Sequence, residues 1–257
     1  GVVAAVREAT GVAAPAIMEM PKVAAIGLSG QMHGAVLLDR AGQAEDAERH
    51  YRLSLAANPD LGEIHLDLGV LLTGRKRLDE AEAALRRALQ LMPESAAAWS
   101  NLGVLQACRK QERDAELSYR AALALDAGHR LARFNLAYLL LRQGRFEEGW
   151  RCLEARDWYH ALEQRLPCPR WQGEDLAGKS LLIGFEAGHG DMIQFCRYAD
   201  VLKARGVARI SLICHPPLVS LFATLAGADQ VISFDEPLPE GEWDFWTPPL
   251  SIPFHCR

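Results

Sequence analysis

The chain has 257 residues, a net charge of −5 and 49% hydrophobic residues. That length allows one large domain or two modest ones, and the mild acidity without a Lys/Arg run argues against a nucleic-acid surface. No apolar stretch reaches the ~18 residues that span a membrane. The six cysteines show no CxxC spacing. This is typical of free thiols in a reducing cytoplasm, so we expect a cytoplasmic protein without a disulfide framework, a metal or a cofactor.

The first 39 residues differ in pattern from the rest of the chain. Residues 1–21 lack the basic start and the unbroken apolar core of a signal peptide, and the start at Gly1 indicates a fragment. Residues 23–39, VAAIGLSGQMHGAVLLD, closely resemble the xylulokinases of the FGGY carbohydrate kinase family. The resemblance implies that Met32 and His33 lie against a sugar.

A working kinase is nevertheless not expected. The family's later catalytic aspartate and phosphate-binding glycine loops have no counterpart in the chain. Phosphoryl transfer needs a base, a metal and a phosphate cradle together. We therefore interpret residues 1–33 as a kinase-like remnant or as an N-terminal cap on the following segment, with a xylulose kinase fragment as a remote alternative.

Residues 34–156 show an internal repeat of 34 residues. Small and large residues both recur at this period, because two antiparallel helices approach closely only where small side chains face each other, and large residues fill the space beside them. Proline ends two of the repeats, since it cannot continue a helix. The period is that of the tetratricopeptide repeat and predicts an all-α solenoid of helix–turn–helix units, about 3.5–4 repeats long. The recurring positions are Ala47, Ala81, Ala115 and Gly149; Tyr51, Leu85, Tyr119 and Leu153; Leu68, Leu102 and Leu136; Pro59 and Pro93.

The kinase-like and repeat patterns overlap at residues 34–39. Ala35 and Leu38 lie one period before Gly69 and Leu72, which are in the first helix of a repeat. We therefore expect Met32 to about Arg40 to be helical and to pack on the helix that contains Ala47. Without that partner Leu53 and Leu55 would face water, at ~1.5–3 kcal/mol for each large apolar side chain.

A polar residue precedes the recurring leucine in three of the predicted first helices: Asp67, Asn101 and Asn135. The series resembles the repeats of O-GlcNAc transferases, in which an asparagine at this place lines the groove and pairs with the backbone of a bound peptide. Asparagine suits that role because one amide both donates and accepts, whereas an ionised Asp67 only accepts. The resemblance implies a protein or peptide partner; the alternative is that these residues merely face solvent.

The repeat pattern stops after Arg156. Residues 157–178 contain Pro167, Pro169 and the turn Trp171-Gln172-Gly173 and are interpreted as a connector. From residue 179 to residue 257 short apolar runs such as SLLIGF, RISLICH and QVISF alternate with helical segments. This alternation predicts βαβ units and a parallel sheet, that is, a partial α/β Rossmann-like domain after the solenoid.

The segment EAGHGD, from Glu186 to Asp191, lies between the first predicted strand and its helix. Gly188 and Gly190 permit a tight turn, and the bare N–H groups of a helix N-terminus can hold an anion. Glu186, Gly188 and Gly190 are therefore candidate residues of a ligand loop. The alternative is a glycine turn with Asp191 as an N-capping residue.

Two longer stretches, LAGKSLLIGFEAGHGDMIQFCRYADVLKARG and CHPPLVSLFATLAGAD, resemble bacterial tetratricopeptide proteins with a glycosyltransferase-like C-terminal region, related to heptosyltransferases and O-GlcNAc transferases. The resemblance implies that Asp191 is a general base. His189 departs from the family's commoner apolar residue and is assigned no role. Such enzymes have two Rossmann-like halves, so we expect residues 179–257 to be an incomplete domain without a donor site.

The sequence thus supports two functions. One is an interaction scaffold that binds a peptide and is fused to an inactive transferase-like domain. The other is the N-terminal part of a glycosyltransferase, in which a nucleotide-sugar would bind only in a longer protein.

Overall fold

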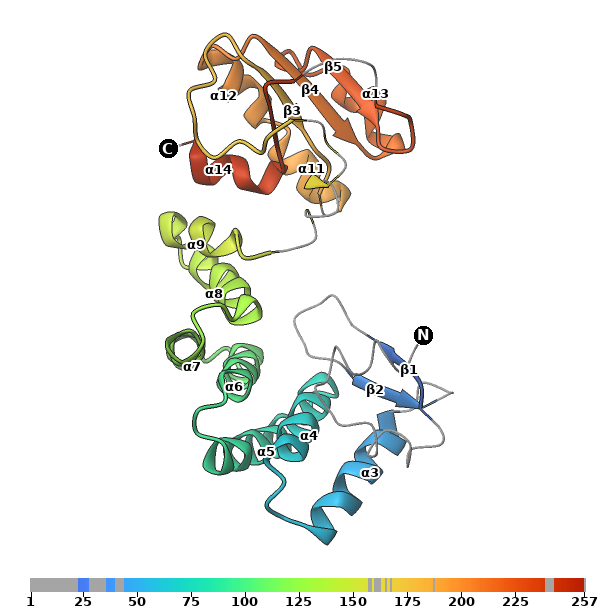
Figure 1. Cartoon of the computed structure of the whole chain (residues 1–257), viewed down its shortest axis with the longest axis vertical. Helices are drawn as coiled ribbons and strands as arrows, with labels where there is room; N and C mark the ends of the chain where they lie inside the picture. The colour runs from blue at the N-terminus through green and yellow to red at the C-terminus, as the bar shows by residue number, and fades with distance from the viewer. Residues whose placement is uncertain are drawn as a thin grey trace. The chain divides into compact units, whose positions relative to one another are not determined.

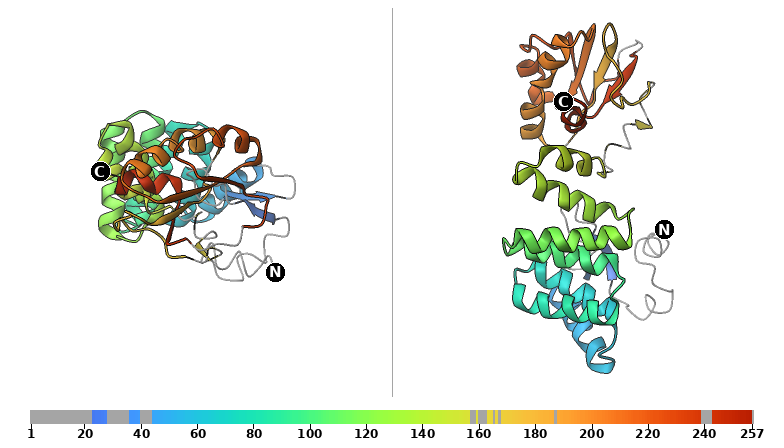
Figure 2. Two further views of the ribbon diagram at one scale, coloured as in Figure 1. Left: turned by 90° about the horizontal axis from the view of Figure 1, so that it is seen from above. Right: turned by 90° about the vertical axis from the view of Figure 1, so that its left-hand side faces the viewer.

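The computed structural model describes residues 23–27, 36–39, 44–156, 159, 163–164, 166, 168–186, 188–238 and 243–256. The chain divides into two compact units, residues 1–144 and residues 145–257. The described residues of the first unit form helices and one small hairpin, and those of the second unit are built around a parallel sheet (Figures 1 and 2).

The hairpin consists of β1 (Val23–Gly27) and β2 (Val36–Asp39), which pair antiparallel with Gly27 opposite Val36. The expected helix from Met32 to about Arg40 is therefore wrong at residues 36–39. A short apolar run does not distinguish strand from helix, and pairing with β1 supplies hydrogen bonds that one isolated helical turn would lack. The kinase-like residues Met32 and His33 lie outside the described residues.

The burial argument for that helix also fails, because Leu53 is 60% exposed. Leu55 does pack, against the core that is shared by the first four helices. The first unit can therefore leave a large leucine in water without a helix to cover it.

Six helices follow the hairpin: α3 (Ala44–Ala57), α4 (Gly62–Gly74), α5 (Leu78–Leu91), α6 (Ala96–Cys108), α7 (Glu112–Leu125) and α8 (Arg130–Arg142). Helices α4 and α5 pack on each other, as do α6 and α7. In each pair a glycine of the first helix lies against a large side chain of the second. A Cβ on Gly69 would stand 2.6 Å from Leu85, and one on Gly103 would stand 2.6 Å from Tyr119. The paired helices expected from the 34-residue period do approach closely at small residues, but each glycine faces a large side chain instead of another small one.

The turns after α4, α6 and α8 share one backbone conformation. Lys76, Lys110 and Gly144 have φ values of 62°, 61° and 76° and are spaced by the repeat period. After α4 the N–H of Lys76 donates to Thr73 and that of Arg77 donates to Leu72. These are the bonds of a Schellman cap, which requires a left-handed residue directly after the helix.

The second unit is an α/β layer structure. Its four parallel strands are β3 (Ser180–Ile183), β4 (Arg209–Cys214), β5 (Gln230–Ser233) and β6 (Phe245–Thr247), in the spatial order β5-β4-β3-β6. Around them lie α9 (Phe146–Leu153), α11 (His189–Phe195), α12 (Tyr198–Ala204), α13 (Val219–Phe222) and α14 (Ile252–His255). A small parallel sheet after the helical repeats agrees with the predicted α/β region.

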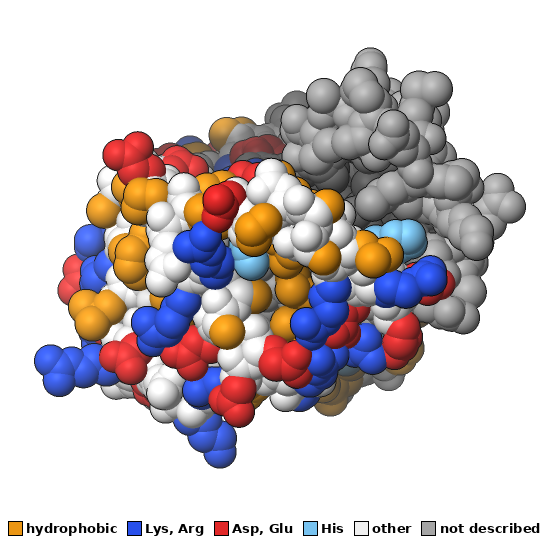
Figure 3. Space-filling view, turned by 90° about the horizontal axis from the view of Figure 1, so that it is seen from below, with side chains coloured by type: hydrophobic (Ala, Val, Ile, Leu, Met, Phe, Trp, Pro, Cys, Tyr) orange, Lys and Arg blue, Asp and Glu red, His pale blue; other side chains and the backbone are white. Residues whose placement is uncertain are grey.

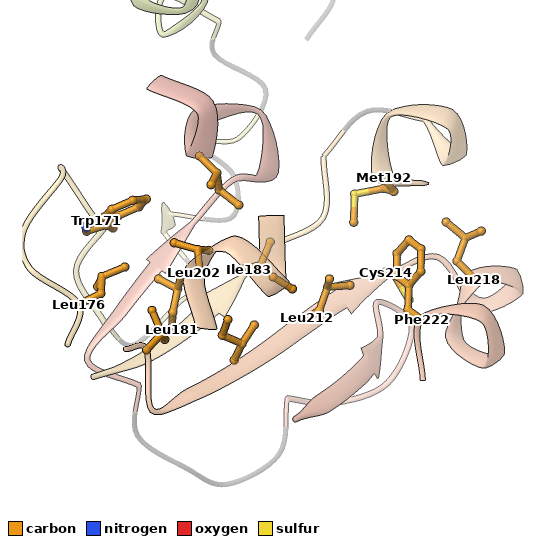
Figure 4. Close-up of a cluster of buried hydrophobic side chains, with 14 residues drawn as sticks. Trp171, Leu176, Leu181, Ile183, Met192, Leu202, Leu212, Cys214, Leu218 and Phe222 are labelled. Atoms are coloured by element: carbon orange, nitrogen blue, oxygen red, sulfur yellow. The ribbon is translucent and has the colours of Figure 1, made fainter. Parts of the chain in front are cut away.

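Successive residues of the strands enter different cores, as the pleat of a strand requires. Leu181 and Ile183 of β3 face the helices with Leu212 of β4, in the cluster drawn in Figure 4. Leu182 and Ile213 face the opposite core, which also holds Trp246. Both faces of the sheet are therefore covered, which is typical of parallel sheets.

Helix α9 belongs to the second unit, although the repeat pattern extends through it to residue 156. It contacts α14, and the ring of Trp150 meets that of Phe195 edge to face at 5.8 Å. An amphipathic helix at the end of a repeat series must bury its apolar face on another element. For α9 this packing surface is provided by α11 and α14 of the second unit.

Candidate functional site

Asp67, Asn101 and Asn135 occupy the same position in α4, α6 and α8. Each directly precedes a buried leucine, and these leucines are 5%, 4% and 2% exposed. Because a buried leucine fixes the rotation of its helix, the three polar residues are held in equivalent orientations. The structure thus keeps the periodic series that the sequence predicts.

Asp67 is a half-buried carboxylate that forms no hydrogen bond or ion pair with the described part of the chain. Burial, reinforced by the charge of Glu63 one turn earlier, raises its pKa to about 6. Burial and the charge of Asp67 in turn raise the pKa of Tyr51. A carboxylate so placed gains from any donor or cation that approaches it.

The two asparagines have different surroundings. The Asn101 amide nitrogen donates to the carbonyl of Ala97 at 2.9 Å, in the preceding turn of α6. Asn135 is only 4% exposed, and its Oδ1 has no hydrogen-bond partner in the described part of the chain. A buried unpaired amide oxygen costs about 1–3 kcal/mol, so Asn135 favours any arrangement that supplies a donor.

Glu186, expected in a ligand loop, faces inward. Its carboxylate forms a two-bond ion pair with the guanidinium of Arg156, and neither side chain is exposed. Arg156 also donates to Ser251 Oγ at 2.7 Å, and Ser251 donates to Glu154 at 2.8 Å. Burial opposes the charge of Arg156, but the hydrogen bond and the charge of Glu186 outweigh it and raise the Arg156 pKa. The network therefore ties the loop after β3 to the segments after α9 and β6.

Asp191 lies in the first turn of α11. Its carboxylate accepts a hydrogen bond from the N–H of Gly188, the residue before the helix, at 3.3 Å. Gly188 and Gly190 are exposed, whereas Asp191 is half-buried. This contact is the one that an acidic residue at the third helical position makes in a capping box, and it leaves one carboxylate oxygen for other contacts.

The structure also brings together aromatic side chains that the sequence did not suggest as a group. Phe185, His189, His215 and Phe234 lie at the carboxyl ends of β3, β4 and β5. The imidazoles of His189 and His215 are 4.4 Å apart, and the rings of Phe185 and Phe234 stack at 4.9 Å. Burial and the neighbouring His189 lower the pKa of His215. The sequence signal for this cluster was that His215 directly follows β4 and Phe234 directly follows β5.

The described residues show neither a cluster of metal ligands nor a membrane-spanning helix. No three His, Cys, Asp or Glu side chains among them come together as a metal site. None of the described helices combines the length and the apolar character needed to cross a membrane.

Comparison with known proteins bears on the helical unit. Residues 40–103 and residues 113–149 match two models of the tetratricopeptide repeat. The chain therefore contains tetratricopeptide repeats. The first match includes α3, α4, α5 and the first part of α6, and the second includes nearly all of α7, α8 and the start of α9.

Similar proteins share only part of their length with this chain. Protein FlbA of Caulobacter vibrioides is 37% identical over 98 residues, which are 36% of this chain and 16% of FlbA. A crystal structure of MamA is 23% identical, with a TM-score of 0.41 over 45% of this chain and 67% of MamA. A mutant O-GlcNAc transferase of Thermobaculum terrenum is 20% identical, with a TM-score of 0.43 over 75% of this chain and 38% of the transferase. At these scores the structural similarities assign no function.

Proposed function

We propose that the chain is an interaction scaffold whose tetratricopeptide repeats bind an extended peptide or protein segment along α4, α6 and α8. The observation that supports this most is the series Asp67, Asn101 and Asn135, held at equivalent positions by the buried leucine that follows each. Stacked repeats present one helix of each unit on a common surface, so equivalent residues form a line across it.

The three side chains offer complementary hydrogen-bonding groups to a peptide backbone. The Asn101 amide nitrogen is engaged with Ala97, so its Oδ1 remains as an acceptor for a backbone N–H. Asn135 Oδ1 is buried and lacks a donor among the described residues, and Asp67 forms no hydrogen bond or ion pair with them. Asp67 and Asn101 therefore favour a ligand that supplies N–H groups at the spacing of the repeats, whereas Asn135 Oδ1 must become accessible before it can accept one.

The test uses variants that change these groups without removing apolar contacts. Asn101→Ala should weaken the binding of a partner peptide at the cost of one hydrogen bond, on the order of 1 kcal/mol or about fivefold in Kd. The melting temperature should stay nearly constant, because Asn101 is not buried. Glu94→Ala, an exposed change in the turn before α6, serves as the control. Equal affinities for the two variants in titration calorimetry would contradict the proposal.

A second candidate function concerns the parallel sheet. In a longer protein, the second unit would be the acceptor half of a sugar transferase, with Asp191 as general base. The spatial order β5-β4-β3-β6 favours this, because the chain changes direction across the sheet between β3 and β6. Open α/β sheets bind ligands at the carboxyl ends of such strands, and Asp191 follows β3.

Proton removal by a positioned carboxylate typically raises the reaction rate about 10²–10⁴-fold. The leaving nucleotide, however, needs its own electrostatic stabilisation. We therefore expect no turnover of UDP-, GDP- or ADP-sugars by these 257 residues. In a longer protein Asp191→Asn should abolish transfer, whereas Asp200→Asn, an exposed change on α12, should not. Turnover by the present chain that disappears in Asp191→Asn would show that its active site is complete.

A further inference from the structure

Two hollows on the repeat unit are lined by residues that correspond at the repeat period, except for Arg87 of the first, which has no counterpart in the second. The first groove, of about 490 Å³, lies among α3, α4 and α5, and the second, of about 450 Å³, lies among α5, α6 and α7. In each groove the two walls are the second helices of neighbouring repeats, and the floor is the first helix that lies between them. Neither contains Asp67, Asn101 or Asn135, so these grooves are distinct from the polar series of the proposed function.

Each floor carries a ring that is fixed to the preceding turn. In the first groove His65 Nε2 lies 2.9 Å from the carbonyl of Pro59, and in the second the indole N–H of Trp99 donates to Pro93 at 3.0 Å. Because these hydrogen bonds hold the rings in place, the floors are preorganised. A preorganised apolar surface loses little conformational entropy when a ligand covers it.

An ion pair spans the first groove. Arg52 on α3 and Glu80 on α5 meet across it at 2.8 Å. In the second groove the equivalent residues are Arg86 and Asp114, and they do not pair. Arg86 binds Glu82 on its own helix at 2.7 Å, and Asp114, one methylene shorter than glutamate, has no ion pair with the described residues.

The second groove carries a large, exposed apolar side chain, whereas none of the residues that line the first groove is both large, apolar and exposed. Where the first groove has Ala83, the second has Leu117, which is 61% exposed. Leu89 and Leu102 complete its apolar lining beside Trp99. On the face drawn in Figure 3, by contrast, apolar side chains are scattered among charged ones without forming a broad patch. Single exposed apolar residues are ordinary, whereas leucine walls around a fixed indole are features of an anchor pocket.

We propose that the second groove is a docking site for an amphipathic helix from a partner protein, whose large apolar residue inserts beside Trp99 and Leu117. The helix carries an acidic residue toward Arg86 and a basic residue toward Asp114. This charge pattern follows from the two walls. One presents Arg86 on α5, which is paired with Glu82 of the same helix, and the other presents Asp114 on α7, which forms no ion pair with the described part of the chain.

A helix fits the groove better than an extended strand. The backbone groups of α5, α6 and α7 are used inside those helices, so the walls offer few partners for an extended backbone. A helix satisfies its own backbone and buries only a stripe of side chains in the groove between two neighbouring helices.

The test uses a fluorescein-labelled, 14-residue helical peptide with one phenylalanine, a glutamate one turn before it and a lysine one turn after it, titrated into the full chain by fluorescence anisotropy. Leu117→Ala should weaken binding about fivefold to tenfold, since apolar burial at the anchor is lost. Asp114→Glu should also weaken binding, about threefold or more, because the longer carboxylate can bridge to Arg86 as Glu80 bridges to Arg52.

Matched controls come from the first repeat. Glu80→Asp, the reverse change in the first groove, and Leu53→Ala, an equally exposed leucine on α3 outside both grooves, should leave the affinity unchanged. A peptide with serine in place of the phenylalanine should not bind.

Equal losses in Leu53→Ala and Leu117→Ala, or no loss in either Leu117→Ala or Asp114→Glu, would overturn the proposal. It would also be overturned if Leu117→Ala changed the oligomeric state in light scattering and left peptide affinity intact, since a second copy would then be the occupant. Asn101→Ala should not affect this peptide, so failure here is separable from failure of the proposed binding along α4, α6 and α8.

Discussion

Gly103 of α6 lies directly against the ring of Tyr119 of α7, so closely that a Cβ on Gly103 would stand 2.6 Å from Tyr119 Cε1. Tyr119 is 3% exposed and cannot move into solvent. Gly103→Ala should therefore destabilise the repeat unit by about 1–3 kcal/mol, the usual cost of overpacking. Gly74→Ala is the matched control, because a Cβ there meets nothing within 4 Å; urea unfolding should show no loss for it.

Lys110 adopts a left-handed backbone conformation after α6, with φ of 61°. Gly144 occupies the equivalent place after α8 without a side chain. A left-handed conformation costs an L-residue about 1–2 kcal/mol. Glycine avoids this cost but loses more conformational entropy on folding. Lys110→Gly should therefore stabilise the chain by on the order of 0.5–1 kcal/mol. Lys110→Ala separates this effect from the loss of charge: it should not stabilise, and a melting temperature as high as that of the glycine variant would refute the explanation.

Asp67 should make the stability of the first unit depend on pH. Its pKa is raised from 3.8 to about 6 by burial and by Glu63, so the folded state binds the proton more tightly than the unfolded chain does. Stability should therefore be highest below the unfolded pKa and fall as the pH rises from about 4 to about 6, by on the order of 2 kcal/mol. Asp67→Asn should remove this slope in denaturant unfolding at several pH values; an unchanged slope would show that the carboxyl is solvated.

The buried pair Arg156–Glu186 gives a prediction for the second unit. Arg156→Met leaves the Glu186 carboxylate buried without its cation and should destabilise the unit by about 3–5 kcal/mol. The double variant Arg156→Met, Glu186→Leu should recover much of that loss, because no uncompensated charge remains. Near-ultraviolet circular dichroism follows the buried Trp243 and Trp246 during thermal unfolding; a double variant as unstable as the single one would contradict this reasoning.

The sequence was most informative where structure depends on residues at a fixed spacing. The paired helices of the repeats follow from the 34-residue period, and the parallel strands follow from short apolar runs between helices. The contacts of Gly69 with Leu85 and of Gly103 with Tyr119 are seen only in the structure. The strand at Val36–Asp39 could not be predicted, because its three apolar residues fit a strand or a helix and pairing with β1 decides between them.

The candidate site shows the same limit. Asp191 at a helix start was predictable from the glycines before it, and the structure adds its bond to Gly188. The burial of Glu186 was not, because its partner Arg156 lies 30 residues away. The contact between His189 and His215 likewise depends on the loops after β3 and β4 meeting at the edge of the sheet.

The most direct test of the central claim, that a peptide binds along α4, α6 and α8, is site-specific photocross-linking. A photoreactive phenylalanine derivative is placed at Asn101 on α6 in one variant and at Arg113, exposed on α7, in another. Each is irradiated with the same partner peptide, and the adducts are mapped by mass spectrometry. The account predicts a peptide adduct from position 101 that Asp67→Asn alters in yield, and none from position 113. Equal adducts from both positions, or an adduct from position 113 alone, would contradict it.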